Sequence, residues 1–465
     1  MRSVEALPPM ERELRAAEIW ACQELREAQL GDERLNLRLA RIVATLAEHP
    51  DCSLPQAMGE WADLKAAYRF FDNPRCQPEQ ILAAHRQATL RRIQGRDLIL
   101  VADDTTQFDF STHHAVQGMG PTGAKGLQGF FMHSGLGMTA DGIPLGLLGC
   151  YSWHRPEGDT TARHSGPQSK ESQRWPDMLQ ASTAGIPAST RVLTIADREA
   201  DFFEFLLTAV LQQQLVLVRA NHDRAVLHEQ AHLWQTVAAA PPLGPNLPVR
   251  IPRADDHPAR TAQFVLRAIP VSIPPPAYRS AEHLPAIRVS AILAQEVEPP
   301  PDSEPVSWML LSTLSVATYQ QAAQCLIWYT YRWRIERFHY TLKSGCGIEK
   351  LQLETAFRIR TALAVYCLVA WRLLYLTYAA REQPEQPCSL FLTQSEWQAL
   401  YARINRTLIL PEQPPDVRTA VRWIAKLGGF LGRKGDGEPG VKVLWRGLRL
   451  LQVIVEDWLL FHPDT

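Results

Sequence analysis

The sequence of 465 residues predicts a central α/β region with helical regions at both ends. Three observations lead to this prediction. Apolar side chains recur at helical spacing up to about residue 92, and strand-like and helix-like runs alternate between residues 97 and 219. Beyond residue 347 the pattern is again helical. A chain of this length holds more than one domain, so we expect the α/β region and the helical ends to fold as separate units.

Composition excludes several classes of protein. The net charge of −1 and the pI near 6.9 argue against a protein that coats nucleic acid nonspecifically. The eight cysteines contain no C-x-x-C pair, so neither a zinc knuckle nor a disulfide framework is expected. Arg372 interrupts the most apolar run, which therefore indicates a buried helix and no membrane span. Because the N-terminus lacks the apolar stretch of a signal peptide, we expect a cytoplasmic protein.

The N-terminal helical region carries polar groups at helical spacing in two segments. They are Arg34, Arg38 and Arg41 in the first and Lys65, Tyr68, Arg69 and Asn73 in the second. Cations that share a helix face are what contact with DNA phosphates requires. Solvated arginines are the alternative interpretation.

The region from residue 97 predicts a sheet with acidic residues at strand ends. DLILVADDTTQFDF is a strand-like run, and two further strands follow around the Asp141-Gly142 turn. After a helix near 171–181, RVLTIA forms a strand that stops at Asp197, and a helix and the strand LVLVR come next. This order matches a ribonuclease-H-like sheet, in which carboxylates at neighbouring strand ends converge.

A third carboxylate, Glu336, lies far along the chain from Asp197. Residues 225–314 between them are rich in proline and contain strand-like runs, which predicts an inserted β domain. Thr318-x-x-Gln321 then forms a capping box that opens a long helix, and Gly345 is placed to end it.

That helix is predicted to present four polar groups on one side. At 100° per residue they fall within about 60° of one another along roughly 21 Å; they are Tyr329, Arg332, Glu336 and Lys343. A carboxylate among phenol, guanidinium and ammonium groups suits a metal-bound phosphodiester. The alternative is a solvated face with ordinary i,i+4 charge pairs.

Asp104, Asp197 and Glu336 together suit two divalent ions, which favour in-line displacement at phosphorus. Asp103 competes with Asp104 for the first position. Adjacent strand residues face opposite ways, so only one of the two points into the site, and spacing alone does not choose. His339 is expected to be a surface histidine of the helix and no metal ligand.

Three motifs in order, ADDTT, ADREAD and Y-x2-R-x3-E-x6-K, resemble those of the bacterial cut-and-paste DDE transposases of the Y-R-E-K insertion-sequence class. Other segments, from LGDERLNLRLARI to LGGFLG and LWRGLRLLQ, extend the resemblance over nearly the whole chain. It implies that Asp104, which precedes the Thr-Thr pair, is the first metal ligand, with Asp197 and Glu336 as the others. The implied cofactor is Mg²⁺ or Mn²⁺, with two ions per site.

The resemblance also implies DNA-contacting residues. Tyr329, Arg332 and Lys343 match positions that hold DNA phosphates, and Arg219 matches an arginine that contacts DNA near the active site. Trp308 matches a tryptophan on which a flipped base stacks; plain core packing is its alternative role. Core packing is the expected role of Trp333.

The implied function is cut-and-paste transposition. Water frees a 3′-hydroxyl at the transposon end, this hydroxyl forms a hairpin, a second water opens it, and the restored 3′-hydroxyl attacks target DNA. The implied partners are double-stranded DNA, both transposon ends and target, and a second copy of the chain in a synaptic homodimer. The alternatives are an inactive end-binding relative that inhibits transposition and a general metal-dependent nuclease.

Five segments are predicted on this basis. They are a DNA-end-binding domain (1–92), the first part of the catalytic domain (93–224), the inserted β domain (225–314), the second part of the catalytic domain (315–382) and a C-terminal dimerisation domain (383–465).

Overall fold

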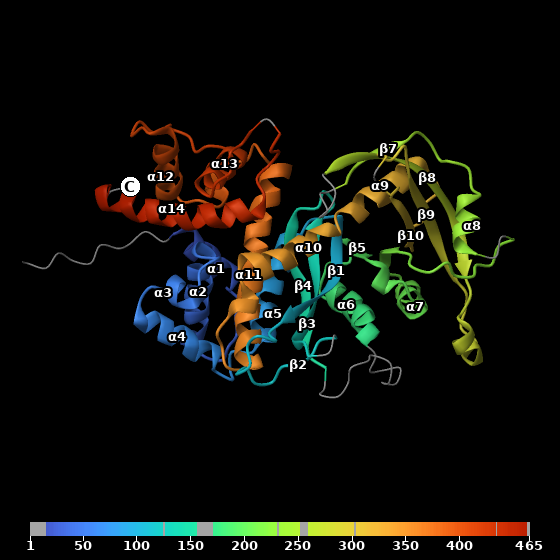
Figure 1. The fold of residues 1–465 in the computed structure, drawn as a ribbon, viewed down its shortest axis with the longest axis horizontal. Coiled ribbons are helices and arrows are strands. Elements are labelled where there is room, and N and C mark those ends of the chain that lie inside the picture. The colour runs from blue at the N-terminus through green and yellow to red at the C-terminus, as the bar shows by residue number, and fades with distance from the viewer. Residues whose placement is uncertain are drawn as a thin grey trace, which may run out of the picture. The chain divides into compact units, whose positions relative to one another are not determined.

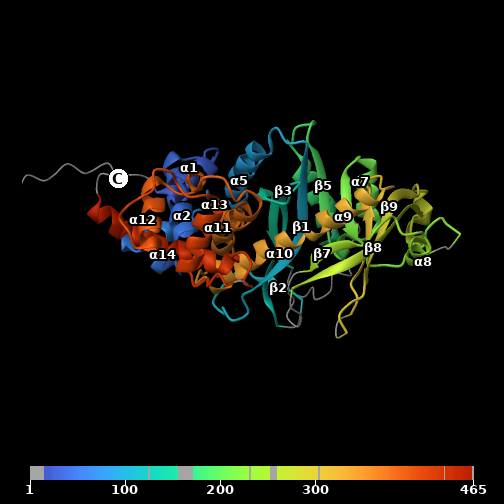
Figure 2. The ribbon, with the colours of Figure 1, turned by 90° about the horizontal axis from the view of Figure 1, so that it is seen from above.

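The computed structural model describes residues 15–123, 126–155, 171–229, 232–251, 259–301, 304–433 and 435–462. The chain divides into two compact units, drawn in Figures 1 and 2. Unit 1 combines Met1–Ala88 with Thr341–Thr465, and unit 2 is Thr89–Tyr340. The two ends of the chain therefore fold together.

Unit 2 is built on one sheet of ten strands in the described residues, in the order β2-β3-β1-β5-β6-β10-β9-β8-β7 with β4 beside β3. The strands are β1 (Leu98–Asp109), β2 (Gly120–Pro121), β3 (Gln128–Thr139), β4 (Pro144–Trp153), β5 (Arg191–Ala196), β6 (Leu215–Arg219), β7 (Leu247–Ile251), β8 (Arg260–Ile273), β9 (Ile287–Val297) and β10 (Ser307–Ser312).

The predicted sheet of the α/β region is present. β4, β3 and β1 are antiparallel, whereas β1, β5 and β6 are parallel. The turn between β3 and β4 is at Asp141-Gly142, where Gly142 has a φ of +86°, a conformation that favours glycine. The order of strands and helices along the chain is the one that the sequence predicts.

The strands predicted for residues 225–314 form, but they continue the same sheet. β10 pairs with β6, with Leu310 opposite Arg219, and β9, β8 and β7 follow outward from β10. Helix α8 (Leu233–Ala238) and the short helix η3 (Ala277–Glu282) connect them. This region is thus an extension of unit 2, joined to the sheet through backbone hydrogen bonds.

Helices cover the sheet of unit 2. They are α6 (Arg174–Thr183), α7 (Phe203–Leu211), α9 (Tyr319–Thr330) and α10 (Trp333–Tyr340). Helix α6 packs on β1, β3 and β4, and α10 packs on β1. Figures 1 and 2 show α9 and α10 following one another along the sheet. The predicted capping box is found at the start of α9, where the Thr318 hydroxyl accepts from the Gln321 N–H.

The single long helix predicted through residues 329–343 is wrong. Helix α9 ends at Thr330, α10 begins at Trp333, and a π-helical turn, Thr341–Gly345, carries Lys343. At the break, the N–H groups of Tyr331 and Arg332 donate to carbonyls three residues back. This tighter winding, followed by the wider π-turn, changes the direction of side chains, so the predicted common face does not extend over the whole segment.

Unit 1 is helical. It contains α1 (Ala16–Glu24), α2 (Glu33–Glu48), α3 (Leu54–Met58), α4 (Trp61–Phe71), α11 (Ala356–Glu382), α12 (Gln394–Asn405), α13 (Val417–Leu427), α14 (Val441–Phe461) and most of α5 (Pro78–Ile93). Helix α11 packs against α2, α4, α13 and α14. It is long and apolar enough to cross a membrane, but 83% of its apolar window is buried, so it is the core helix of this unit.

Two glycines explain why α13 and α14 approach closely. A Cβ at Gly428 would lie 1.9 Å from the Val443 carbonyl oxygen, and one at Gly447 would lie 1.8 Å from the Ile424 carbonyl oxygen. Only glycine leaves room for the two backbones there. These glycines belong to the LGGFLG and LWRGLRLLQ segments noted in the sequence.

Candidate functional site

Asp104 lies within β1, and Asp197 directly follows β5, the neighbouring parallel strand. The first acid was expected at a strand end, but β1 continues to Asp109. Ala102 pairs with Ile195 between β1 and β5, and two residues further along each strand come Asp104 and Asp197. Adjacent strands are about 4.8 Å apart, so the two carboxylates start from neighbouring backbone positions. Asp197 follows the end of β5, where its Oδ1 accepts from the Glu199 N–H at 2.8 Å. β5 ends at Ala196, directly before Asp197, as the sequence predicts.

Asp103 faces the opposite side of the sheet from Asp104. It follows Ile99 and Val101 on the face of β1 that packs in an apolar cluster, and it is fully buried. Neither of its carboxyl oxygens has a hydrogen-bond partner. Burial raises the pKa of Asp103 well above its ordinary value, and the Asp104 carboxylate adds to the rise. These surroundings favour the neutral form of Asp103 over the charged form.

Glu336 lies on α10, the helix that packs on β1. Its side chain is 50% exposed, and its Oε1 accepts from Arg332 Nη2 at 2.5 Å. This contact is the i,i+4 pair that the sequence left as an alternative. Arg332 itself is buried, so its guanidinium is fixed beside Glu336.

Asp104 experiences the charges of both other carboxylates. The pKa of Asp104 is raised to about 7: burial is the largest cause and the carboxylates of Asp197 and Glu336 add to the rise, whereas Arg332 opposes it. The three predicted ligands are thus electrostatically coupled. In the part of the chain that the structure describes, however, no group of three or more His, Cys, Asp or Glu is arranged to hold a metal ion. The carboxylate of Glu336 instead forms an ion pair with Arg332.

His339 corrects the expectation of a surface histidine. It is only 6% exposed; its Nε2 lies 2.9 Å from Ser134 Oγ, and its Nδ1 lies 3.8 Å from Asp104 Oδ2. It follows Ile335 by four residues, so it shares the packed face of α10 and points toward β1 and β3. The spacing from Ile335 was the signal in the sequence that indicates burial.

Trp308 lies in an aromatic cluster. The indole is 5% exposed, is stacked on Phe264 with centroids 5.3 Å apart, and meets Tyr329 and Trp333 edge to face. In this structure Trp308 is a core residue, the alternative that the sequence left open. Trp333 packs against it as expected. A base would reach the stacked face of the indole only after Phe264 moved.

Tyr329 and Arg219 lie near this cluster. Tyr329 is buried, which raises the pKa of its phenol, while Arg332 and Arg219 act in the opposite direction. Arg219 is half-buried at the end of β6, opposite Leu310 on β10. Lys343 belongs to unit 1, on the π-helical turn, and its part in the site stays a prediction.

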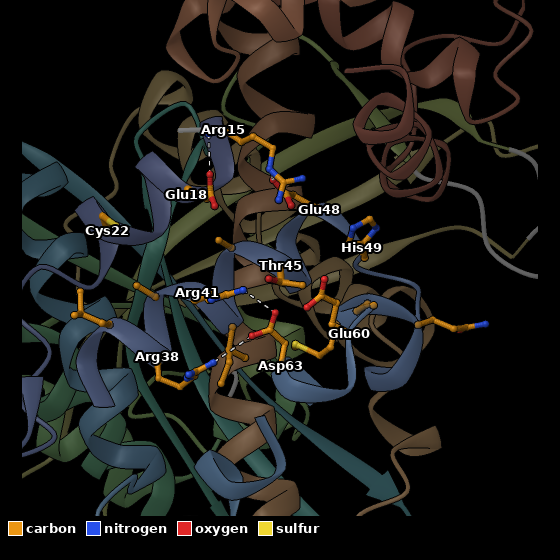
Figure 3. A pocket seen from close by; sticks show the side chains of 18 of the residues that line it. Arg15, Glu18, Cys22, Arg38, Arg41, Thr45, Glu48, His49, Glu60 and Asp63 are labelled. Carbon is orange, nitrogen blue, oxygen red and sulfur yellow. Dashed lines mark hydrogen bonds and ion pairs between the residues drawn. The ribbon is translucent and has the colours of Figure 1, made fainter. Parts of the chain in front are cut away.

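A basic groove of about 480 Å³ lies between α2 and α4 in unit 1. Its lining combines both predicted sets of polar groups: Arg34, Arg38, Lys65, Arg69 and Asn73, with Leu35, Ala62, Ala66 and Phe70. No acidic side chain is among these lining residues. Tyr68 and Arg41 are outside the groove, and Arg41 faces a neighbouring hollow (Figure 3). Such a groove suits a phosphate backbone.

Family models match three regions of the chain. Residues 17–76 match the model described as transposase DNA-binding, which spans the basic groove. Residues 178–372 match the transposase DDE domain, which includes Asp197 and Glu336. Residues 368–460 match the transposase Tn5 dimerisation domain, which includes α12, α13 and most of α14.

Proposed function

Because this chain belongs to the Tn5-like DDE transposases, we propose that it cuts transposon ends through a hairpin and joins the freed 3′ ends to target DNA. The observation that carries the proposal is the placement of Asp104 and Asp197 at neighbouring positions of β1 and β5, with the helix that carries Glu336 packed on β1. Three carboxylates with an adjacent guanidinium suit metal-dependent chemistry on a phosphodiester.

The chemistry of the donors fits a hard divalent cation. Asp104, Asp197 and Glu336 offer only oxygen atoms, the ligands that Mg²⁺ and Mn²⁺ prefer. We assign these three residues to hold two such ions, which would activate the attacking oxygen and stabilise the leaving oxygen. For Glu336 to take part, its carboxylate must exchange Arg332 for the metal.

The same exchange releases Arg332 for DNA. A guanidinium freed from Glu336 binds phosphate oxygens in a bidentate manner, next to the buried Tyr329 and the half-buried Arg219. In each transfer the attacking oxygen forms a bond to phosphorus and loses a proton, and the departing oxygen leaves with the bonding pair and gains one. We assign Arg332, Tyr329 and Arg219 to hold the phosphate in line for that attack.

Base flipping at Trp308 requires the aromatic cluster to open. Extruding a base costs a few kcal/mol, and stacking on an aromatic side chain offsets part of that cost. The stack of Phe264 on Trp308 would give way to the stack of the flipped base on Trp308. This step belongs to hairpin formation, so the first nick does not need it.

We assign binding of the transposon end to the groove between α2 and α4. We assign formation of the dimer to the C-terminal region. Helix α14 exposes apolar side chains at helical spacing: Leu450, Val453, Leu460 and Phe461. An exposed apolar stripe of this kind suits a protein interface. In the synaptic dimer that we propose, each copy binds one end through its groove and cleaves the end that its partner holds.

The test uses the purified chain, the DNA that flanks its own gene as a labelled duplex, and Mg²⁺. We expect nicking at the element boundary, then a hairpin product on a denaturing gel, and no cleavage without a divalent cation. Binding without cleavage would favour the inactive relative. Cleavage with equal efficiency on a duplex of scrambled sequence would favour the general nuclease.

A further inference from the structure

Asp63 forms ion pairs with two arginines of α2, Arg38 and Arg41. It lies in the first turn of α4, and its carboxylate oxygens are 2.6 Å from Arg41 Nη2 and 3.4 Å from Arg38 Nη1. Figure 3 shows all three side chains at the wall of a hollow of about 830 Å³. One acid thus bridges two cations that sequence spacing assigns to DNA.

We propose that Asp63 is an internal counter-ion that occupies Arg38 and Arg41 in the free protein and that a DNA phosphate displaces it. This inference rests on the proposed role of the groove between α2 and α4 in binding DNA. Its consequence is that Asp63 weakens phosphate binding to DNA of any sequence.

The cationic side chains on the two sides of the groove differ in whether they form ion pairs with acidic residues. Lys65 and Arg69 on α4 line the groove, and neither makes an ion pair within the described residues. Arg38 on α2 lines both the groove and the hollow, and it is tied to Asp63 on the hollow side. A phosphate in the groove therefore meets Lys65 and Arg69 directly, whereas it has to compete with Asp63 for Arg38. A phosphate that contacts Arg41, which lines the hollow, meets the same competition.

A DNA phosphate can displace Asp63 because the ion pairs of Asp63 with Arg38 and Arg41 are accessible to solvent. The side chains of Arg38 and Arg41 are 35% and 63% exposed, and ion pairs between exposed groups are weak. Each phosphate that gains an Arg contact also releases counterions, which favours the exchange at low salt. Asp63 lowers that gain by one charge for any duplex, whatever its sequence.

The preference for the transposon end has a different source. An end adds base contacts to the phosphate contacts that any duplex makes. Loss of the Asp63 charge should therefore strengthen binding to scrambled DNA and to the end by about the same factor. The near-neutral net charge of the chain agrees with a protein that limits nonspecific binding.

The experiment compares Asp63→Asn with Glu60→Gln in the full chain, by fluorescence anisotropy on an end-containing and a scrambled duplex at several salt concentrations. Glu60 lines the same hollow and makes no ion pair within the described residues, so its variant removes an equal charge without freeing an arginine. We expect Asp63→Asn to bind both duplexes roughly threefold to tenfold more tightly, by about the same factor. Glu60→Gln should show less than half of that gain.

Arg69→Ala separates the inference from the proposed function. If Arg69→Ala leaves DNA affinity unchanged, the groove is not the DNA site. If Arg69→Ala weakens binding while Asp63→Asn also weakens it or leaves it unchanged, the groove stands and the counter-ion role is overturned, because Asp63 would then orient the arginines. Equal gains for Asp63→Asn and Glu60→Gln would also overturn it. Should Asp63→Asn fail to fold, Asp63→Ser gives the same comparison, since serine is tolerated at helix starts.

Discussion

Asp103 and Asp104 are adjacent and chemically identical, yet they face different environments. Asp103 lies on the face of β1 that α6 covers, without a hydrogen-bond partner, whereas Asp104 faces α10 among Asp197, Glu336, Arg332 and His339. Burial raises the pKa of both carboxyls. The difference is in what surrounds them, because only the Asp104 side gathers further carboxylates that a cation would neutralise.

The largest expected difference is that between the cleavage rates of the variants Asp104→Asn and Asp103→Asn. Asparagine has the same shape without the charge, so it spoils a metal ligand and leaves a neutral core acid almost unchanged. We expect Asp104→Asn to slow cleavage of an end-containing duplex by more than about 100-fold while binding is retained, since loss of even a supporting residue at a metal site costs about 10–100-fold. Asp103→Asn should stay within about threefold of the parent chain, as its neutral form binds no cation.

Single-turnover nicking measures the rate, and a gel-shift titration measures the binding. If Asp103→Asn lost cleavage and Asp104→Asn kept it, the assignment of the two faces would be reversed. If both kept it, the carboxylates of β1 would have no catalytic role.

A smaller effect is expected at His339, which lies on the Asp104 side and joins α10 to Ser134 on β3. We interpret it as a positioning residue that fixes α10, and with it Glu336, against β1. His339→Ala should lower the cleavage rate about tenfold, and Ser134→Ala should lower it by less. DNA affinity should not change in either variant.

A structural role alone would give a different result at His339. The thermal midpoint would fall in proportion to the loss of rate, and a raised Mg²⁺ concentration would restore nothing. We expect a displaced Glu336 to show as a raised Mg²⁺ requirement at saturating DNA, which the dependence of nicking rate on Mg²⁺ measures.

A separate effect is expected on stability against pH without divalent cations. Folding raises the pKa of both carboxyls above their ordinary value of 3.8, so the folded protein holds protons that the unfolded chain releases. The contribution of these two carboxyls to the free energy of unfolding is therefore greatest at low pH. It falls as the pH rises toward their pKa in the folded protein. For Asp104 the loss is on the order of 4 kcal/mol and is complete near pH 7.

Thermal midpoints between pH 5 and pH 8 measure this loss. Asp104→Asn should flatten the fall below pH 7, and Asp103→Asn should flatten it over the whole range. Added Mg²⁺ should flatten it in the Asp103→Asn variant and have little effect in the Asp104→Asn variant. A parent chain whose stability rose with pH over this range would contradict the burial of both groups.

The local parts of this account could be predicted from the sequence. The strand that stops at Asp197, the Asp141-Gly142 turn and the Thr318 capping box each depend on a few adjacent residues. The alternation of β1 also placed Asp103 and Asp104 on opposite faces before their surroundings were known.

The parts that depend on tertiary packing could not. The break between α9 and α10 has no glycine or proline to mark it, and the pairing of β10 with β6 joins strands that are far apart in sequence. The pairs of Asp63 with Arg38 and Arg41 join two helices, so spacing within either helix does not show them. His339 was missed because its polarity outweighed its spacing from Ile335.

The most direct test of the central claim counts bound Mn²⁺ by electron paramagnetic resonance in the complex of the chain with end-containing DNA. We expect two ions per active site in the parent chain and in Asp103→Asn, and fewer in Asp104→Asn, Asp197→Asn and Glu336→Gln. Full Mn²⁺ occupancy in Asp104→Asn together with a loss in Asp103→Asn would contradict it.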